Sequence, residues 1–374
     1  MMGQLPYEIW TSHAGDLAFT VTAPAVWAEE QRRYLAQYLP GRLGDRGLGT
    51  FHLDVHVNDA DCHQMVWEAT RSPIARRIEP VPGVVLLERL TSSGARCYAV
   101  AADAVEHQAR AFAVRVHDRH IELYLHRTAR KPHGYPLRLM REAMLRTYED
   151  HGGVVFHAAG ADLDGRGVMI CGPRSSGKTT LLTCLLRSMR GDLLSNDRLV
   201  LDRRGRLVAV PLPVPVARGT IDAVPELDNA VRALSRPQRD VGELPTTFGA
   251  TAKAEFSAHE YTTALGTSLA AGSWLRTIIV PRLTDTTEPT RTRLLPADEA
   301  QQVLAANCFT PYDEFWIQPW LVPRTTPDAE LHRHAQQLTQ QLAADIPCFE
   351  VSFGVRNPLN QLDKAVLDLL RNPQ

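Results

Sequence analysis

Lysine is scarce in this chain. Its 374 residues include 41 lysines and arginines, of which four are lysine, at positions 131, 178, 253 and 364. With 42 acidic residues the formal net charge is −1, so the chain lacks the positive field that attracts nucleic acid, and we expect no nucleic-acid partner. Because lysine is so rare in this sequence, a lysine at a motif position is less readily explained by chance.

Paired cysteines and long apolar runs are also missing. The six cysteines are scattered without C-x-x-C spacing, so neither a disulfide framework nor a zinc site is predicted. No apolar run reaches the roughly 18 residues that span a bilayer. The first residues carry neither the basic nor the apolar region of a secretory signal. We therefore expect a cytoplasmic protein with no membrane partner.

Residues 168–186 have the pattern of a phosphate-binding loop between a short apolar strand and a leucine-rich helix. Gly172, Gly177, Lys178 and Thr179 fit the spacing G-x-x-x-x-G-K-[ST]. The glycines let backbone N–H groups point at phosphate oxygens, and the helix N-terminus adds partial positive charge. Lys178 can reach the β- and γ-phosphates, and the Thr179 hydroxyl can ligate Mg²⁺.

The loop therefore predicts a site for ATP or a similar nucleoside triphosphate, with Mg²⁺ as the metal. The alternative is a chance match in an ordinary strand–turn–helix. The predicted nucleotide-binding residues are Gly172, Pro173, Arg174, Ser175, Ser176, Gly177, Lys178, Thr179 and Thr180.

A polar pair follows the loop helix. Residues 191–195 read as a strand that ends in Asn196 and Asp197. Phosphate-loop proteins place a second magnesium carboxylate at such a strand end. We therefore predict Thr179 and Asp197 as the metal ligands, the alternative being that Asp197 is only a turn residue between two strands.

The first 130 residues show strand-like alternation with little helix and no catalytic constellation. We predict a smaller, β-rich α+β domain over residues 1–130, for substrate docking or dimer contacts, so a homo-oligomer is possible. Strands are expected at 8–11, 17–22, 51–57, 84–87, 96–100, 111–116 and 121–125, and a helix at 27–39.

Residues 131–374 are predicted to form one α/β domain around the phosphate loop, since the length suits two domains of roughly 150 residues or more. A helix over 136–148 has proline in its first turn and glycines beyond its end. A hairpin over 154–170 turns at Asp164 and Gly165. Further elements are strands at 274–283 and 348–353 and helices at 296–306, 328–344 and 360–371.

The stretch 222–263 is polar and irregular. A run of this kind in a compact domain is often a lid or substrate loop. Most of its arginines are expected to be solvated surface residues. The cationic candidates in and beside it are Arg218, Arg232, Arg236, Arg239 and Lys253.

Residues 154–216 resemble the kinase domain of the HPr kinase/phosphorylase family. The matching features are a strand ending in His157, the Asp-Gly-Arg-Gly turn at 164–167, the loop at 172–179, and Ser-Asn-Asp-Arg-Leu at 195–199. Residues 348–354 are similar to the end of HPr-kinase-like proteins of natural-product clusters, some of which phosphorylate serine on lasso peptides. The resemblance implies a phosphate loop in a mixed sheet, similar to phosphoenolpyruvate carboxykinase.

The resemblance also implies roles for four residues. His157, Lys178, Asn196 and Asp197 would be the catalytic group, with Lys178 on the phosphates and His157 beside the transferred phosphoryl group. The family has paired aspartates after the loop, whereas here the first position is Asn196, which can orient a hydroxyl but cannot take its proton. The family's glycine-rich signature for phosphorolysis has no clear counterpart, so phosphorylase activity is not expected.

The expected function is therefore an ATP- and Mg²⁺-dependent kinase. Its acceptor would be a serine or threonine of a peptide or small protein, which includes ribosomal natural-product precursors. The alternatives are a kinase for a small-molecule hydroxyl, a regulatory nucleotide switch without an acceptor, and a scaffold that has lost turnover.

Overall fold

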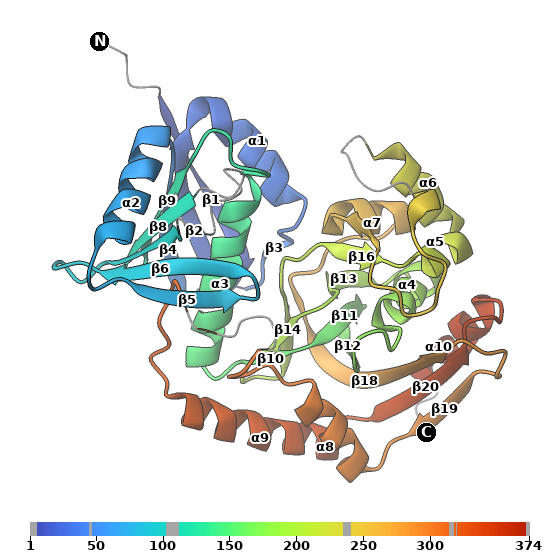
Figure 1. Ribbon diagram of the computed structural model, residues 1–374. Coiled ribbons are helices and arrows are strands. Elements are labelled where there is room, and N and C mark those ends of the chain that lie inside the picture. Colours follow the sequence, from blue (N-terminus) through green and yellow to red (C-terminus); the bar gives the residue numbers. More distant parts are fainter. Residues whose placement is uncertain are drawn as a thin grey trace. The chain divides into compact units, whose positions relative to one another are not determined.

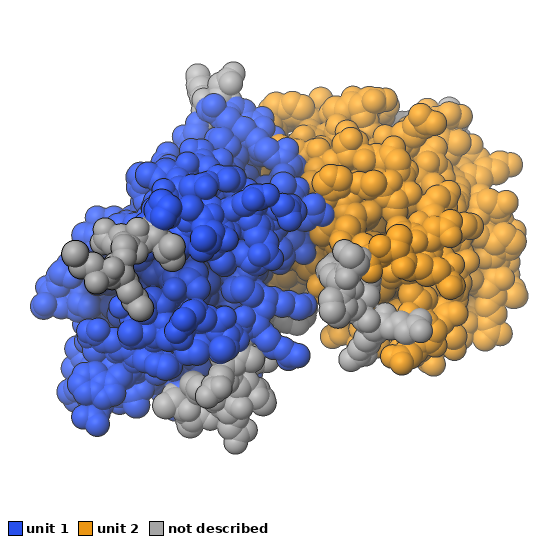
Figure 2. All heavy atoms as spheres, turned by 90° about the horizontal axis from the view of Figure 1, so that it is seen from above, with its two compact units in different colours: residues 1–150, 311–327 blue, residues 151–310, 328–374 orange. Residues whose placement is uncertain are grey.

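The computed structural model describes residues 6–44, 47–101, 112–234, 241–313, 318 and 320–371. The chain forms two compact units (Figure 2). Unit 1 comprises residues 1–150 and 311–327, and unit 2 comprises residues 151–310 and 328–374. Both units combine helices with a large mixed sheet, so the chain is α/β, as the sequence predicts.

The division differs from the predicted one near residue 130, because helix α3 (Gly134–Asp150) belongs to unit 1. The backbone N–H of Asp16 donates a buried hydrogen bond of 2.9 Å to the hydroxyl of Tyr148 on α3. This contact joins the helix to the turn between the first two strands. The amphipathic face of α3 is thus used in unit 1.

The sheet of unit 1 has nine strands in the order β3-β1-β2-β4-β9-β8-β7-β6-β5 (Figure 1). The pairs β1–β3, β2–β4 and β4–β9 are parallel, and the others are antiparallel. The strands are β1 (Tyr7–Gly15), β2 (Leu17–Pro24), β3 (Gly41–Arg42), β4 (Gly49–Val57), β5 (Arg76–Val81), β6 (Val84–Leu90), β7 (Arg96–Val100), β8 (Phe112–His117) and β9 (His120–Leu125).

The described part of unit 1 contains two helices besides α3. Helix α1 (Ala25–Ala36) lies where the sequence predicts one, whereas α2 (Asp59–Arg71) was not predicted. Helix α2 starts at Asn58, whose side chain accepts a hydrogen bond from the N–H of Ala60. It buries the small side chains of Cys62 and Ala69, with Met65 and Val66 partly buried beside them.

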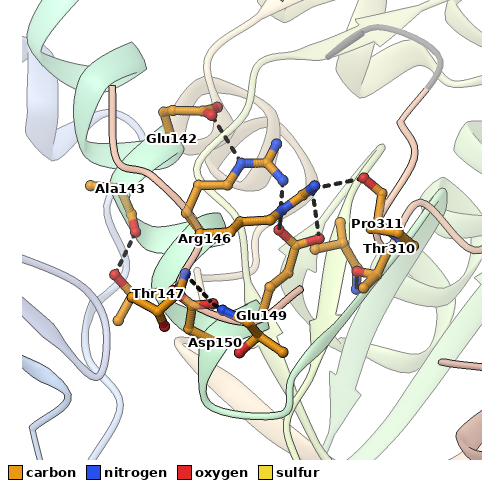
Figure 3. A network of polar contacts seen from close by, with 12 residues as sticks. Glu142, Ala143, Arg146, Thr147, Glu149, Asp150, Thr310 and Pro311 are labelled. Atoms are coloured by element: carbon orange, nitrogen blue, oxygen red, sulfur yellow. Dashed lines mark hydrogen bonds and ion pairs between the residues drawn. The ribbon is translucent and has the colours of Figure 1, made fainter. Parts of the chain in front are cut away.

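A buried network of charges fixes residues 311–327 to unit 1 (Figure 3). Arg146 on α3 contacts Glu142 at 3.0 Å and Glu149 at 2.5 Å. Arg324 contacts Glu149 at 3.1 Å and donates a hydrogen bond of 2.7 Å to the carbonyl of Pro311. All four charged side chains are almost inaccessible to water. Their charges are therefore compensated by one another, as buried charges require.

The central sheet of unit 2 carries the path β10-β14-β15-β18-β12-β11-β13, with β20 beside β18 and β19 beside β20. Strands β12, β18 and β20 run parallel, and β11–β12 is the predicted hairpin. The strands are β10 (Val154–Phe156), β11 (Ala158–Leu163), β12 (Arg166–Cys171), β13 (Asp192–Ser195), β14 (Leu199–Leu201), β15 (Arg206–Ala209), β18 (Gly272–Thr284), β19 (Arg291–Leu294) and β20 (Cys348–Gly354).

Helices cover both faces of this sheet (Figure 1). Helices α8 (Ala297–Ala306) and α9 (Asp328–Asp345) bury Leu304, Ala335 and Leu342 against Phe156 and Met169. Helix α4 (Lys178–Met189) packs on β11 and β12 and against α10 (Asn360–Arg371).

The segment predicted to be irregular, 222–263, contains regular structure. It includes α6 (Pro225–Ala233), a 3₁₀ turn (Val241–Glu243), β17 (Ala254–Phe256) and α7 (Ala258–Leu265), and α5 (Arg218–Ala223) precedes α6. Strand β17 pairs with β16 (Val214–Val216) in a separate two-stranded sheet. Helix α7 begins with a capping box formed by Ser257 and Glu260, a local signal that the polar composition obscured.

Candidate active site

The phosphate loop joins the end of β12 to the start of α4 in unit 2. Gly177 precedes the helix with φ = 105°, and a Cβ atom there would lie 2.5 Å from the side chain of Leu283 on β18. Both its backbone conformation and this contact therefore require glycine. The N–H of Leu283 also donates a hydrogen bond of 3.0 Å to the carbonyl of Ser176, so β18 fixes the loop.

Lys178 is the first residue of α4, and its side chain turns back over the loop. Its ammonium group donates hydrogen bonds to the carbonyl oxygens of Gly172 at 2.6 Å and Pro173 at 3.0 Å. The residue is 8 % exposed. The loop thus holds a largely buried positive charge at the N-terminus of a helix. Both the ammonium group and the positive end of the helix dipole favour binding of an anion there.

Thr179 and Asn196 meet although they lie on different elements. The Thr179 hydroxyl donates a hydrogen bond of 3.0 Å to the side-chain oxygen of Asn196, directly after β13. The neighbouring Thr180 turns elsewhere, because its hydroxyl pairs with that of Thr220 on α5 at 2.9 Å. The two threonines therefore have different contacts: Thr179 binds Asn196, and Thr180 connects α4 to α5.

Asp197 is contacted through both of its oxygens. Nε2 of His157 lies 3.4 Å from Oδ1, and the guanidinium of Arg198 lies 2.7 Å from Oδ2. Burial would raise the pKa of Asp197, but the hydrogen bond with His157 and the charges of Arg198, His157 and Lys178 lower it to about 2. The carboxylate is therefore ionised at neutral pH.

His157 is fixed between β10 and β11. Its backbone N–H donates a hydrogen bond of 2.8 Å to the carbonyl of Asn307. Its ring stacks on Phe309, with centroids 5.1 Å apart and planes 14° apart. The guanidinium of Arg198 lies 5.3 Å from the same Phe309 ring. The sequence carried no signal for Phe309, because it follows α8, far along the chain.

Lys253 is a further member of the site. It immediately precedes β17 and is partly buried. Burial lowers the pKa of Lys253, the charge of Arg174 in the loop lowers it further, and Asp197 opposes the shift. Lys253 thus lies within electrostatic reach of both the phosphate loop and the carboxylate.

The other cationic candidates behave differently. Arg218 pairs with Asp222 at 2.7 Å, and Arg232 pairs with Asp228 at 3.0 Å, each within one helical turn. These are helix-surface pairs of small energetic value. Arg236 and Arg239 lie outside the described residues.

The assembled site carries more positive than negative charge. One carboxylate, Asp197, contacts Arg198, the charge of Lys178 lowers the pKa of Asp197, and the pKa of Lys253 responds to the charges of both Asp197 and Arg174. Such an excess suits a polyanion such as a triphosphate. The long side chains come from three separate segments, so the charge is concentrated by the fold.

The residues present fit a magnesium ion that is shared with a nucleotide. Within the described part of the chain, no cluster of three or more His, Cys, Asp or Glu side chains could hold a metal ion. Thr179 and Asp197 supply one hydroxyl and one ionised carboxylate. Mg²⁺ is commonly bound by one or two such protein groups, with phosphate and water oxygens as its remaining ligands.

No model of a protein family matches the chain, and no curated protein matches it. Among the helices described, none has the length and apolar character needed to cross a membrane. The loop motif and the geometry around it are therefore what point to a function.

Proposed function

We propose that this protein is an ATP- and Mg²⁺-dependent kinase of HPr-kinase-like architecture, which transfers the γ-phosphoryl group to a hydroxyl. The observation that carries the proposal is the convergence at one loop of Lys178, the Thr179–Asn196 pair and the ionised Asp197 bridged to His157. The proposed acceptor is a serine or threonine of a peptide or small protein.

The residues of the site take separate roles in this reaction. Lys178 neutralises charge on the β- and γ-phosphates, and Lys253, immediately before β17, adds a second ammonium group. Thr179 and Asp197 would hold Mg²⁺, which neutralises part of the phosphate charge. Asn196 keeps the Thr179 hydroxyl in a fixed orientation through their hydrogen bond. Asp197 can serve a metal as well as its present partners, because a carboxylate has about four lone-pair sites.

His157 is suited to accept the acceptor's proton. Nε2 faces Asp197, so a proton on Nε2 would be held by the carboxylate and the lone pair would lie on Nδ1. In the transfer, the acceptor oxygen forms a bond to Pγ and the bond between Pγ and the ADP oxygen breaks. The hydroxyl proton passes to Nδ1. Asn196 cannot take this proton. His157 therefore acts as the proton acceptor in place of the aspartate that the resembling family has at position 196.

Two other functions use the same site. A small-molecule hydroxyl would need the same phosphoryl-transfer groups. A nucleotide switch would need the phosphate loop but no proton acceptor. The paired His157 and Asp197 favour transfer over a switch.

Labelled ATP distinguishes these functions. The protein is incubated with γ-labelled ATP and with peptides, small proteins or small hydroxyl compounds, and the label is followed. We expect the label on an acceptor; label found only as free phosphate would favour the switch, and absence of nucleotide binding would refute the proposal. Lys178→Met should abolish transfer, because one preorganised charge of this kind contributes about 3–4 kcal/mol to the transition state.

The scarcity of lysine offers a matched control. Lys364 on α10 is exposed, so Lys364→Met removes a lysine without touching the loop. Transfer should persist in this variant. Equal loss of activity in both variants, or a folded Lys178→Met protein that keeps most of its activity, would contradict the assigned role of Lys178.

A further inference from the structure

The segment that follows α8 is held against the strand that leads to His157. The N–H of Phe309 donates a hydrogen bond of 2.8 Å to the carbonyl of Val155, and the N–H of Val155 donates one of 2.9 Å to the hydroxyl of Thr310. The carbonyl of Asn307 accepts the N–H of His157. These three hydrogen bonds hold the segment that contains Phe309 in a fixed register beside His157.

The ring of Phe309 contacts both side chains that hold Asp197. His157 stacks on it nearly in parallel, and the guanidinium of Arg198 lies over it at 5.3 Å. His157 engages one oxygen of Asp197 and Arg198 the other. The Phe309 ring therefore contacts both side chains that bind the Asp197 carboxylate.

We propose that Phe309 is a positioning residue that holds the His157 imidazole and the Arg198 guanidinium on the two oxygens of Asp197. This inference rests on the proposed function only for its catalytic consequence. A stacked ring restricts rotation of the imidazole, and the negative face of the ring attracts the guanidinium. Phe309 touches no reacting atom; it acts through its two neighbours.

Phe309 is also a buried residue, so a purely structural role must be separated from positioning. It is 7 % exposed, and Phe349 on β20 is 6 % exposed in the same unit. Replacing either by leucine shortens a buried aromatic side chain to a similar degree. Phe349→Leu is therefore the matched control for loss of packing, and Phe309→Tyr is the conservative variant that keeps the ring.

The first measurement is the NMR spectrum of the histidine rings in the full-length protein without nucleotide, with His157 assigned by His157→Gln. We expect Phe309→Leu to shift the ring ¹⁵N resonances of His157 away from those of a single tautomer protonated on Nε2, because the imidazole is no longer held with Nε2 on Asp197. Phe309→Tyr and Phe349→Leu should leave them in place. Unchanged His157 resonances in a folded Phe309→Leu protein would overturn the proposal.

The second measurement separates rate from binding. In Phe309→Leu we expect kcat to fall about ten- to a hundredfold, as a misplaced catalytic group does, while the Kd for Mg-ATP changes less than about twofold. Phe309→Tyr should retain most of kcat. A fall in kcat that Phe349→Leu reproduces in full would assign the effect to packing and overturn the proposal.

The two measurements also separate this inference from the proposed function. If the wild-type protein transfers no phosphoryl group to any acceptor, the kinase proposal fails. The His157 resonances then decide the positioning role without reference to activity.

Discussion

Nε2 of His157 and Oδ1 of Asp197 lie 3.4 Å apart at the mouth of a phosphate loop that belongs to other elements of the fold. Asp197 follows β13, and His157 separates β10 from β11. In the proposed reaction the pair would orient the imidazole and leave Nδ1 to accept a proton. A base oriented in this way by a carboxylate is typical of sites that transfer a group to a hydroxyl.

His157→Ala should lower the maximal rate of transfer roughly a hundredfold or more, because general-base assistance is removed. The Kd for ATP should change little, because the described side-chain contacts of His157 are with Asp197 and Phe309, which lie outside the phosphate loop. Steady-state kinetics over a range of pH, with calorimetry for Kd, measure both effects. His334→Ala is the control: this histidine lies on α9 and contacts only the carbonyl of Gly152 at 2.9 Å among its described hydrogen bonds. An unchanged rate and pH profile in His157→Ala would reduce His157 to a packing residue.

Asp197→Asn should remove Mg²⁺-dependent transfer, because the amide lacks the charge that a metal ligand needs. It should also change acid stability. The folded-state pKa of Asp197 is lowered to about 2, below the value of about 3.9 in an unfolded chain. Its contribution to stability is therefore complete above about pH 4 and is lost as the pH falls toward 2.

Urea unfolding of the wild type and of Asp197→Asn between pH 2 and pH 6 measures this. The difference between the two should shrink as the pH falls. Asp192→Asn, at the other end of β13, is the control, since Asp192 accepts only a loop N–H at 3.0 Å in its described contacts. A difference that stays constant with pH would show that Asp197 is not held ionised by its neighbours.

Lys253→Met should weaken ATP binding about tenfold, the cost of one hydrogen bond to a charged group. The pKa of Lys253 is lowered by burial and by Arg174, so the ammonium loses its proton at a lower pH than an exposed lysine. An anion favours the protonated form. Binding should therefore take up a proton at alkaline pH, and affinity should fall as the pH rises.

Calorimetry in buffers of different ionisation enthalpy measures that uptake. It should be present in the wild type and in Lys364→Met, and absent in Lys253→Met. Equal proton uptake in all three proteins would place Lys253 outside the nucleotide site.

Arg146→Met should destabilise unit 1 by about 3–5 kcal/mol, because it removes the described partner charge of buried Glu142 and leaves Glu149 with Arg324 as its remaining described partner. Arg33→Met removes an exposed pair with Glu29 at 2.8 Å and should cost less than about 1 kcal/mol. Denaturant unfolding compares the two. Similar losses in both variants would show that the buried network contributes no more than a surface ion pair.

The sequence predicted the elements whose signals are local. Alternating residues identified most strands of the unit 1 sheet, and the turn at Asp164 and Gly165 identified the β11–β12 hairpin. Helices α6 and α7 were not predicted because they lie in a segment whose overall composition is polar, and α2 was not predicted because it follows strand β4 after a single residue. The predicted boundary near residue 130 differs from the division into compact units because an amphipathic helix does not reveal which sheet it will cover.

The candidate site divides in the same way. The phosphate loop and the residues after β13 follow a spacing that can be read along the chain. Phe309 carried no signal in the sequence, and Lys253 was only one of several cationic candidates, because the contacts of Phe309 and the electrostatic interactions of Lys253 depend on long-range packing of the segments after α8 and before β17. Composition and spacing describe neighbours in sequence, whereas these residues become neighbours only in the folded unit.

Residues 311–327 belong to unit 1 but are translated after residues 151–310 of unit 2. Glu149 is translated long before Arg324, one of its two cationic partners. Unit 1 therefore cannot complete its buried charge network until the ribosome has also made most of unit 2. A chain released or cut before residue 324 would lack the contact of Arg324 with Glu149, one of the two described ion pairs that compensate this buried carboxylate.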